Sequence, residues 1–361
     1  MDVIFVLNCG SSSIKFQLIE PESGQIHLKG IAENLNTSRA TLKWSQGSKN
    51  LESSDYSTAL NEILKLLEGK EILAVGHRVV HGGETFKASV KIDDAALANI
   101  EKCNHLAPLH NPVNVLGIQI MREKFPTFPQ VAVFDTAFHQ TMPQVAYLYA
   151  LPYDYYEKYQ VRRYGFHGTS HRYVVQKGAE EIGKPLEDTS FISCHLGNGC
   201  SIAAVKGGKS LDTSMGFTPL EGLVMGHRSG DLDPSIVAFL AEKLHLSAEK
   251  VVNILNKESG LLGVSGISED MRLLTESQNE RAKLAIDLFC YRLAKYIASY
   301  LVPLGSVDGV IFTGGIGENS QRIRNQVIDH LKPLNLKSFV IPTNEELMIA
   351  RDAAEVVRRE K

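Results

Sequence analysis

Hydrophobic positions recur along this chain with two periods, and each period predicts a different kind of element. Spacings of three and four residues predict helices over 56–67, 114–124, 171–182, 234–244 and 280–301. Unbroken apolar runs predict strands buried on both faces at 72–75, 131–134 and 310–312. Because strands alternate with helices, the pattern predicts an α/β fold in which helices pack on the sheets.

The start of the chain has a pattern that returns near residue 190. Residues 3–31 predict three strands, joined by a glycine-rich turn at 8–13 and a second turn at 21–24. Residues 191–212 repeat this order, and Ser201-Ile202 matches Ser13-Ile14 after the first turn. The repeat indicates a duplicated domain.

Length and composition agree with a globular protein of two domains. The 361 residues suit two hydrophobic cores better than one, and 43% hydrophobic with 22% charged residues argues against disorder. A net charge of -3 gives no electrostatic reason to expect nucleic acid or an acidic membrane as a partner. No linker rich in Gly, Ser or Pro is found, so we expect a hinge between the domains and a ligand site in the cleft between them.

The N-terminus and the cysteines predict a cytoplasmic location. The first residues lack the basic start and the cleavage site of a signal peptide. No run approaches the roughly 20 apolar residues that span a bilayer. The five cysteines include no C-x-x-C pair, so we expect reduced thiols.

Three glycine-rich turns, at 8–13, 195–199 and 314–319, follow predicted strands. Glycine allows consecutive N–H groups to point at one phosphate, and Ser11, Ser13 and Lys15 add donors and a positive charge. The alternative is that these turns only connect strands. No dinucleotide-binding motif is completed after Gly197 or Gly315, and the chain has no Walker-type P-loop.

Histidines, arginines and aspartates cluster at 77–84, 106–112, 133–139, 164–171 and 225–234. Arg78 follows a predicted strand, so we expect it at a strand end that faces a cleft. A simpler alternative for Arg228 is an ion pair with Asp231 or Asp233.

Two histidine pairs raise the alternative of a zinc site. His77/His81 and His167/His171 have i, i+4 spacing, but neither pair has the glutamate of H-E-x-x-H and no cysteine cluster lies near. Each histidine could instead be a hydrogen-bonded loop residue. The basic and aromatic run at 162–173 does not indicate nucleic acid, because the whole chain is acidic.

Taken together, these segments resemble the acetate kinase family, within the superfamily of acetate and sugar kinases, heat-shock chaperone ATPases and actin. Eight motifs in order carry the resemblance, at residues 8–16, 76–84, 134–139, 163–171, 195–199, 226–234, 313–319 and 342–346. It implies two duplicated α/β domains of the actin-like or ribonuclease H-like kind, with an interdomain cleft. Residues 1–140 and 344–361 would form the acid and phosphate side, and residues 141–343 the nucleotide-binding domain.

The resemblance also implies a reaction and its ligands. The expected reaction is reversible phosphoryl transfer between ATP and acetate, which gives ADP and acetyl phosphate, with Mg²⁺ or Mn²⁺ as cofactor. The expected assembly is a homodimer without nucleic-acid or membrane partners. One alternative is a propionate kinase or another short-chain acyl kinase. A second is an ATP switch of the chaperone or actin kind, although no appended peptide-binding domain is visible.

Roles are implied for individual residues. The resemblance implies a catalytic group of Arg78, Asp135, His167 and Arg228, and a metal site at Asn8 and Glu345. The implied acid-binding residues are Arg78, Val80, Leu109, His110, Phe166 and Pro219. The expected phosphate and nucleotide contacts are Ser11, Ser13, Lys15, His195, Leu196, Gly197, Asn198, Gly199, Asp270, Met271, Arg272, Gly315, Ile316, Gly317, Glu318 and Asn319.

The chemistry of the reaction suits these residue types. A carboxylic acid with a pKa near ~4 to 5 is ionised at neutral pH, so its oxygen needs no general base. Its attack brings an anion to a polyanion, and arginines, histidine and magnesium would neutralise the phosphoryl group. We expect Asp135 to fix the metal through water or to orient Arg78, not to accept a proton.

One position bears on the choice of acid, and two residues and one segment depart from the family pattern. Propionate kinases tend to have alanine where this chain has Val80, so acetate is favoured, although one methylene is worth only ~1 to 3 kcal/mol. His227 stands where the family usually has threonine, and Cys200 replaces a frequent glycine. The segment 331–340 is shorter than in typical members.

Overall fold

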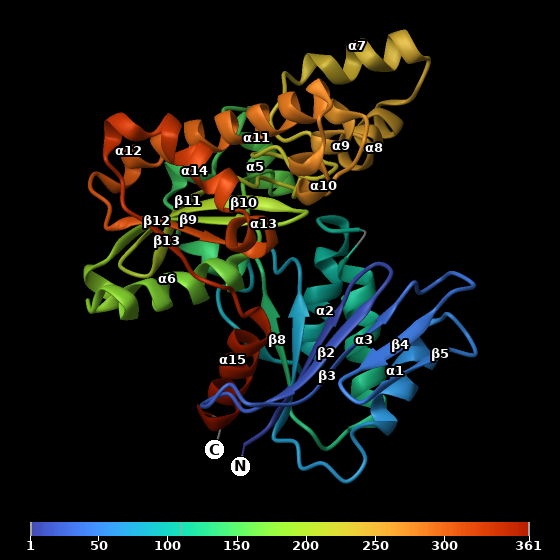
Figure 1. Ribbon diagram of the computed structural model, residues 1–361. Coiled ribbons are helices and arrows are strands. Elements are labelled where there is room, and N and C mark those ends of the chain that lie inside the picture. The colour runs from blue at the N-terminus through green and yellow to red at the C-terminus, as the bar shows by residue number, and fades with distance from the viewer. Residues whose placement is uncertain (1, 109, 360–361) are drawn as a thin grey trace. The chain divides into compact units, whose positions relative to one another are not determined.

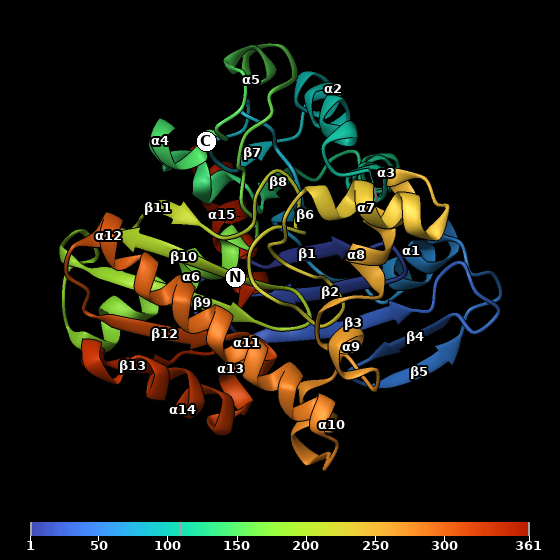
Figure 2. The ribbon, with the colours of Figure 1, turned by 90° about the horizontal axis from the view of Figure 1, so that it is seen from above.

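The computed structural model describes residues 2–108 and 110–359 and separates them into two compact units. Unit 1 consists of Met1–Phe138 and Asn344–Lys361, and unit 2 of His139–Thr343. Each unit is built on one β-sheet, and helices cover the sheets (Figures 1 and 2). Among the described residues, no helix combines the length and the apolar character needed to cross a membrane.

Unit 1 carries an eight-stranded sheet of order β5-β4-β3-β2-β1-β6-β8-β7. Its strands are β1 Ile4–Cys9, β2 Ile14–Ile19, β3 Ile26–Glu33, β4 Thr41–Trp44, β5 Gly47–Asn50, β6 Ala74–Val79, β7 Val90–Lys91 and β8 Gln130–Phe134. Its helices are α1 Tyr56–Lys65, α2 Asp94–Lys102, α3 Asn111–Lys124 and α15 Glu345–Arg359.

Helices cover both faces of this sheet, and nearly all residues of its central strands are therefore buried. Helix α15 packs against β1, β6 and β8, and α1 and α3 lie on the opposite face (Figure 1). Gly76 in β6 permits the close approach of α15, since a Cβ at this position would lie 2.8 Å from Cγ2 of Ile349. The C-terminal helix is therefore part of the core of unit 1.

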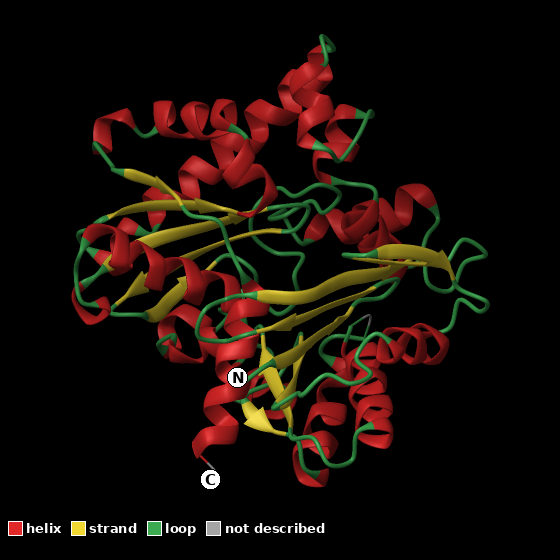
Figure 3. Cartoon of the chain, turned by 60° about the horizontal axis from the view of Figure 1, so that its bottom comes forward, coloured by secondary structure: helices red, strands yellow, loops and turns green. Residues whose placement is uncertain are grey.

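Unit 2 carries a five-stranded sheet of order β11-β10-β9-β12-β13. Its strands are β9 Ser190–Leu196, β10 Cys200–Lys206, β11 Lys209–Thr213, β12 Gly309–Thr313 and β13 Ser338–Val340. Its helices are α4 Gln144–Tyr147, α5 Tyr153–Tyr159, α6 Gly168–Ile182, α7 Ser235–Leu244, α8 Ala248–Lys257, α9 Gly260–Ser265, α10 Met271–Glu276, α11 Glu280–Ser299, α12 Leu301–Leu304, α13 Gly314–Asn319 and α14 Gln321–His330. Helix α6 covers one face of the sheet, and α11, α12 and α14 lie on the other (Figure 1). Figure 3, coloured by secondary structure, shows the strands in yellow with helices in red around them.

The two sheets share one topology, which confirms the predicted duplication. In unit 1, β1 pairs antiparallel with β2 and parallel with β6, which in turn pairs parallel with β8. In unit 2, β9 pairs antiparallel with β10 and parallel with β12, which pairs parallel with β13. In both units the first two strands form the hairpin that the glycine-rich turn predicted.

The predicted elements are present, with shifts of up to four residues in their bounds and one change of type. Helix α3 begins at Asn111 and α6 at Gly168, three residues earlier than the apolar spacing indicated. The strand predicted at 72–75 lies at Ala74–Val79. The third glycine-rich segment, predicted as a turn, is the short helix α13, which begins directly after β12. All five cysteines are free, as predicted, and all five are also buried.

Candidate functional site

Arg78 and Asp135 meet at the carboxyl ends of two neighbouring strands of unit 1. Strands β6 and β8 are parallel, so the last residue pair, Val79 and Phe134, brings Arg78 beside the residue that follows β8. Arg78 donates from Nε to Asp135 Oδ1 at 2.9 Å and from Nη2 to Oδ2 at 2.6 Å. Burial opposes the charge of Arg78, but the attraction of Asp135 outweighs it and raises the pKa of the guanidinium. Asp135 therefore holds the Arg78 guanidinium at two points.

Oxygen-bearing side chains lie around this ion pair. Asn8, in β1, accepts from Arg78 Nη1 at 3.4 Å. Glu345 is the first residue of α15, and burial raises the pKa of its carboxyl to about 7, against the opposing attraction of the positive charge of Arg78. None of the described side chains forms an ion pair or hydrogen bond with this carboxylate, so it is available to a ligand.

The donor set suits a hard cation. Mg²⁺ prefers oxygen ligands and is usually held by one or two carboxylates with waters and substrate phosphates. The described residues include no cluster of three or more His, Cys, Asp and Glu residues that could hold a metal alone. Asn8 and Glu345 fit a magnesium ion shared with a phosphate ligand.

The turn between β1 and β2 is closed by the Gly10 N–H, which donates to the Ser13 carbonyl at 2.8 Å. Tyr56 also fixes the turn, because its hydroxyl donates to the Gly10 carbonyl. Ser11 and Lys15 are exposed beside it. Their donors are therefore accessible, as a phosphate-binding role requires.

The predicted acid-binding residues belong to both units. In unit 1, Val80 is buried and its N–H donates to Asn114 Oδ1 at 3.0 Å, and His110 directly precedes α3. In unit 2, Phe166 is buried and the carbonyl of Pro219 accepts from Arg228 Nη1 at 3.2 Å. Leu109 lies outside the described residues.

His167 and Arg228 converge on one glycine of unit 2. An ideal Cβ on Gly199 would lie 3.5 Å from Arg228 Nη1 and 3.5 Å from His167 Cε1, so both side chains contact the same point of the backbone. Gly199 belongs to the turn between β9 and β10, and a larger residue there would crowd both groups. The turn thus places two potentially cationic side chains beside its own N–H groups.

His167 is held in place by neighbouring side chains. It precedes α6 with φ +55°, a left-handed conformation that is uncommon outside glycine. Its ring stacks on His195 at a centroid distance of 4.3 Å, and its Nδ1 lies 2.9 Å from Ser201 Oγ. Ser201 also contacts Nε2 of the buried His171 at 2.8 Å. Burial lowers the pKa of His171, so this ring is neutral.

Arg228 has no carboxylate partner among the described residues, so the ion-pair alternative is wrong. The Asp231 carboxylate accepts from the Gly222 N–H and the Tyr296 hydroxyl, and Asp233 accepts from the Ser235 N–H. Within the described part of the chain, Arg228 itself donates only to the Pro219 carbonyl and the Met225 sulfur. Burial lowers the pKa of this guanidinium. A desolvated cation without an anion is an incomplete arrangement that a negatively charged ligand would complete.

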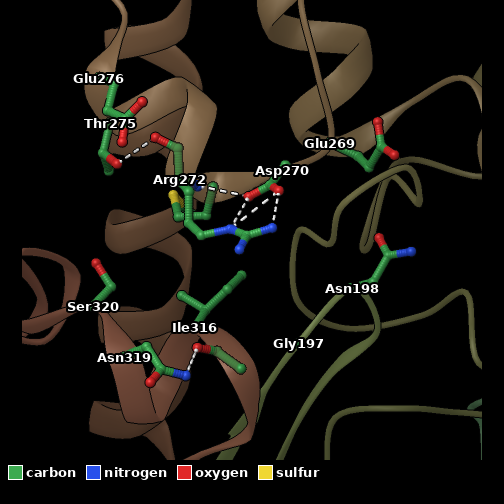
Figure 4. A pocket seen from close by; sticks show the side chains of 12 residues that line it. Gly197, Asn198, Glu269, Asp270, Arg272, Thr275, Glu276, Ile316, Asn319 and Ser320 are labelled. Atoms are coloured by element: carbon green, nitrogen blue, oxygen red, sulfur yellow. Dashed lines mark hydrogen bonds and ion pairs between the residues drawn. The ribbon is translucent and has the colours of Figure 1, made fainter. Parts of the chain in front are cut away.

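A cavity of about 780 Å³ lies beside the same turn, entirely within unit 2 (Figure 4). Its volume is in the range typical of sites for small ligands. Eight residues of its lining were predicted as nucleotide contacts: Gly197, Asn198, Asp270, Met271, Arg272, Gly315, Ile316 and Asn319. The turn therefore lines the cavity through Gly197 and Asn198 and contacts His167 and Arg228 through Gly199.

Some cavity residues were not predicted, and some predicted residues lie elsewhere. The lining also includes Glu269, Thr275, Glu276 and Ser320, which have no motif and whose only signal is their place beside predicted contacts. Among the predicted contacts, His195, Leu196, Gly199, Gly317 and Glu318 do not line the cavity. The Glu318 carboxylate accepts from the N–H groups of Gly314 and Thr343, which gives it a structural role.

Among the described residues, neither i, i+4 histidine pair belongs to a group of three or more His, Cys, Asp and Glu residues that could hold a metal ion. His77 lies in strand β6, where helical spacing has no meaning, and contacts Gln130 Oε1 at 2.7 Å. His81 accepts the Gly83 N–H through its Nδ1. His167 and His171 both contact the Ser201 hydroxyl.

Comparisons with known proteins agree on one family. Residues 3–338 match the model of the Acetokinase family. An acetate kinase of Thermotoga maritima is 50% identical over an alignment of 398 positions including gaps, which covers 99% of each chain. A solved propionate kinase of Francisella tularensis subsp. tularensis has a TM-score of 0.94 and 45% identity, covering 98% of this chain and 99% of that one. A solved acetate kinase of Porphyromonas gingivalis has a TM-score of 0.92 and 42% identity, covering 99% and 100%.

Proposed function

The chain belongs to the acetokinase family, and from this premise we propose that it transfers a phosphoryl group reversibly between ATP and acetate, with ADP and acetyl phosphate as products. One observation carries the proposal most directly. The turn at Gly197–Gly199 borders the 780 Å³ cavity and also contacts Arg228, a cation without an anionic partner among the described residues. A nucleotide in the cavity would direct its terminal phosphate along this turn towards that cation.

The reaction needs charge neutralisation more than proton transfer. The carboxylate of acetate is already ionised at neutral pH, so no general base is required. Arg228 and His167 would donate to the oxygens of the phosphoryl group as it transfers, and the fork of an arginine suits such oxygens. His167 is fixed for this role by its stacking on His195 and its contact with Ser201.

Unit 1 would supply the acid side of the reaction. Arg78, held in a two-point ion pair by Asp135, would bind the carboxylate or the phosphoryl oxygens with its remaining donors. Asn8 and Glu345 would hold Mg²⁺, which neutralises phosphate charge when it is bound. Ser11, Ser13 and Lys15 would contact phosphate oxygens.

The cavity in unit 2 would hold the nucleoside part of ATP. Gly315 and Ile316 at the start of α13 offer backbone N–H groups, and the residues of α10 form another wall (Figure 4). A helix of six residues adds only a weak dipole, so we attribute binding to the fit of the cavity. Gly197 and Asn198 would contact the start of the phosphate chain.

The second candidate function is that of a propionate kinase, because the solved propionate kinase of Francisella tularensis subsp. tularensis matches this chain with a TM-score of 0.94. Val80 would narrow the acid pocket and favour the smaller acid. Replacing Val80 with alanine should raise the activity with propionate relative to acetate by about fivefold to a hundredfold, which corresponds to one methylene. An unchanged ratio of the two kcat/KM values would refute the assignment of Val80 to the pocket.

A hydroxamate assay tests the proposed function. Purified protein with ATP, Mg²⁺ and acetate should form acetyl phosphate, which hydroxylamine traps, and product should disappear without acetate or after chelation of the metal. ATP hydrolysis that does not depend on acetate would instead indicate an ATP switch.

The family resemblance also implies a cytoplasmic homodimer. Light scattering of the purified protein measures its mass in solution.

A further inference from the structure

His227 bridges the end of helix α8 and the nucleotide cavity. Its ring Nδ1 lies 2.8 Å from the backbone carbonyl oxygen of Asn256, in the last turn of α8. Its Nε2 lies 3.3 Å from the side-chain nitrogen of Asn198, which lines the cavity. The proposed function assigns no role to this histidine.

Hydrogen-bond chemistry fixes the tautomer of the neutral ring. A backbone carbonyl can only accept, so Nδ1 of His227 carries the proton that points at Asn256. Nε2 then has a lone pair, which accepts an N–H of the Asn198 amide. The contact consequently selects one of the two orientations of the amide, with its nitrogen towards His227.

Gly226 packs so closely against Asn198 that a side chain at position 226 would overlap with the Asn198 amide. A Cβ on Gly226 would lie 1.9 Å from Asn198 Oδ1, and the Gly226 N–H donates to the Asn198 carbonyl at 3.0 Å. Figure 4 shows the Asn198 side chain at the rim of the cavity, with its nitrogen directed away from Ile316 and Arg272. The amide is exposed, so without these contacts its orientation would be free.

We propose that His227 is a positioning residue for nucleotide binding, which acts by holding the Asn198 amide in one orientation at the cavity. This inference rests on the proposed function, since it assigns the cavity to the nucleotide. An amide that is already ordered loses less conformational entropy when a ligand binds. His227 thus affects the affinity for ATP and ADP, and leaves the binding of the acid unchanged.

Variants of His227 separate this role from a structural one. His227→Leu removes both hydrogen bonds and should raise the Kd and the KM for ATP about threefold to tenfold, the effect of one modest hydrogen bond. The KM for acetate and kcat should change less than twofold. His227→Gln can donate to Asn256 and accept from Asn198, so it should restore most of the affinity.

A double-mutant cycle tests whether the effect passes through Asn198. In an Asn198→Ala background, His227→Leu should leave the Kd for ATP unchanged, because no amide remains to be positioned. His330→Leu, an exposed histidine at the end of α14, is the matched control and should bind ATP as the wild type does. Independent, additive effects of the two substitutions would overturn the proposal. A loss of kcat with no change in the Kd for ATP would overturn it as well.

Calorimetry with ATP and the hydroxamate assay together separate a failure of the proposed function from a failure of the role assigned to His227. If the wild type binds ATP but makes no acetyl phosphate, the proposed function fails and the cycle still decides the role of His227. If turnover is normal and His227→Leu binds ATP with wild-type affinity, only the role of His227 fails. Absence of ATP binding in the wild type would refute both.

The ¹⁵N shifts of the His227 ring test the tautomer directly. They should show a proton on Nδ1, and a proton on Nε2 alone would contradict the proposed hydrogen bonds.

Discussion

At the scale of single residues, the two arginines of the candidate site are held in opposite ways. Arg78 is neutralised by Asp135 through two hydrogen bonds, so its position is fixed by an anion of the protein. Arg228 donates only to uncharged groups, so its charge is not balanced by a described carboxylate. Arg228 therefore gains most from an incoming anion, and Arg78 serves as a rigid donor.

Replacing Arg228 with glutamine should separate activity from stability. We expect kcat to fall about a hundredfold to a thousandfold, the usual effect of removing one donor from a developing charge. The melting temperature should stay the same or rise, because a desolvated cation is removed. Arg292→Gln, an exposed change on α11, is the control. A parallel drop in the melting temperature would show that Arg228 is structural.

The buried His77 predicts a dependence of stability on pH. Burial lowers the pKa of His77 to about 4 from 6.5, so the unfolded chain binds more protons between these values. Stability should therefore fall as the pH drops below 6.5, and the loss should be complete below pH 4. At pH 5 the free energy of unfolding should be about 2 kcal/mol lower than at neutral pH because of this histidine. Urea unfolding at pH 7 and pH 5, followed by the fluorescence of Trp44, the single tryptophan and part of unit 1, measures it.

His77→Gln keeps a hydrogen-bonding side chain next to Gln130 and removes the titration. Its free energy of unfolding should differ between pH 7 and pH 5 by about 2 kcal/mol less than that of the wild type. His105→Gln, an exposed histidine in the same unit, should retain the wild-type dependence. Equal pH dependence in wild type and His77→Gln would contradict the argument.

At the scale of elements, the start of α13 depends on one glycine and not on the next. Gly314 has φ +76°, and a Cβ there would lie 2.8 Å from the Leu196 carbonyl oxygen. Gly315 has open space around it. Gly314→Ala should lower the free energy of unfolding by about 2 to 4 kcal/mol through strain and overlap. Gly315→Ala should change it by less than about 1 kcal/mol. Thermal unfolding by circular dichroism compares the two, and equal effects would be inconsistent with this backbone geometry.

The pattern of apolar residues predicted most elements, because the buried residues of the helices recur periodically and those of the central strands follow one another without a break. It placed the start of α3 three residues late, since Asn111 begins that helix with buried polar groups that carry no hydrophobic signal. It missed that 314–319 is helical, because glycine has low helix propensity and α13 is held by Glu318 bonding to the Gly314 N–H. Tertiary contacts decide such elements, and a single sequence does not show them.

At the scale of the whole molecule, the predicted fold class of two related α/β units of the actin-like kind is confirmed by strand topology and by the solved relatives. The resemblance supplied the residues of the candidate site, and the structure supplies their partners. The contact of Arg228 and His167 with Gly199 joins segments far apart in the sequence. The missing carboxylate partner of Arg228 was also not visible from the sequence, where Asp231 and Asp233 lie close by.

Helix α15 should decide the stability of unit 1. Ile349 is buried between this helix and the sheet, so Ile349→Asp would place an unpaired charge in the core. We expect a loss of at least about 4 kcal/mol, measured by the fluorescence of Trp44 in urea. Glu355→Gln, an exposed change on the same helix, should be nearly neutral. Wild-type stability in Ile349→Asp would mean that α15 does not complete the core.

The place of α15 in the sheet of unit 1 also sets an order for folding on the ribosome. Translation releases residues 139–343 as one continuous stretch, so unit 2 can fold as soon as it has left the exit tunnel. Unit 1 begins before unit 2 but needs Glu345–Arg359 to cover β1, β6 and β8, so this face of its sheet stays uncovered until those residues have followed unit 2 out of the tunnel. During that interval the exposed face is the natural target for chaperones, and the unit synthesised first is the last to be completed.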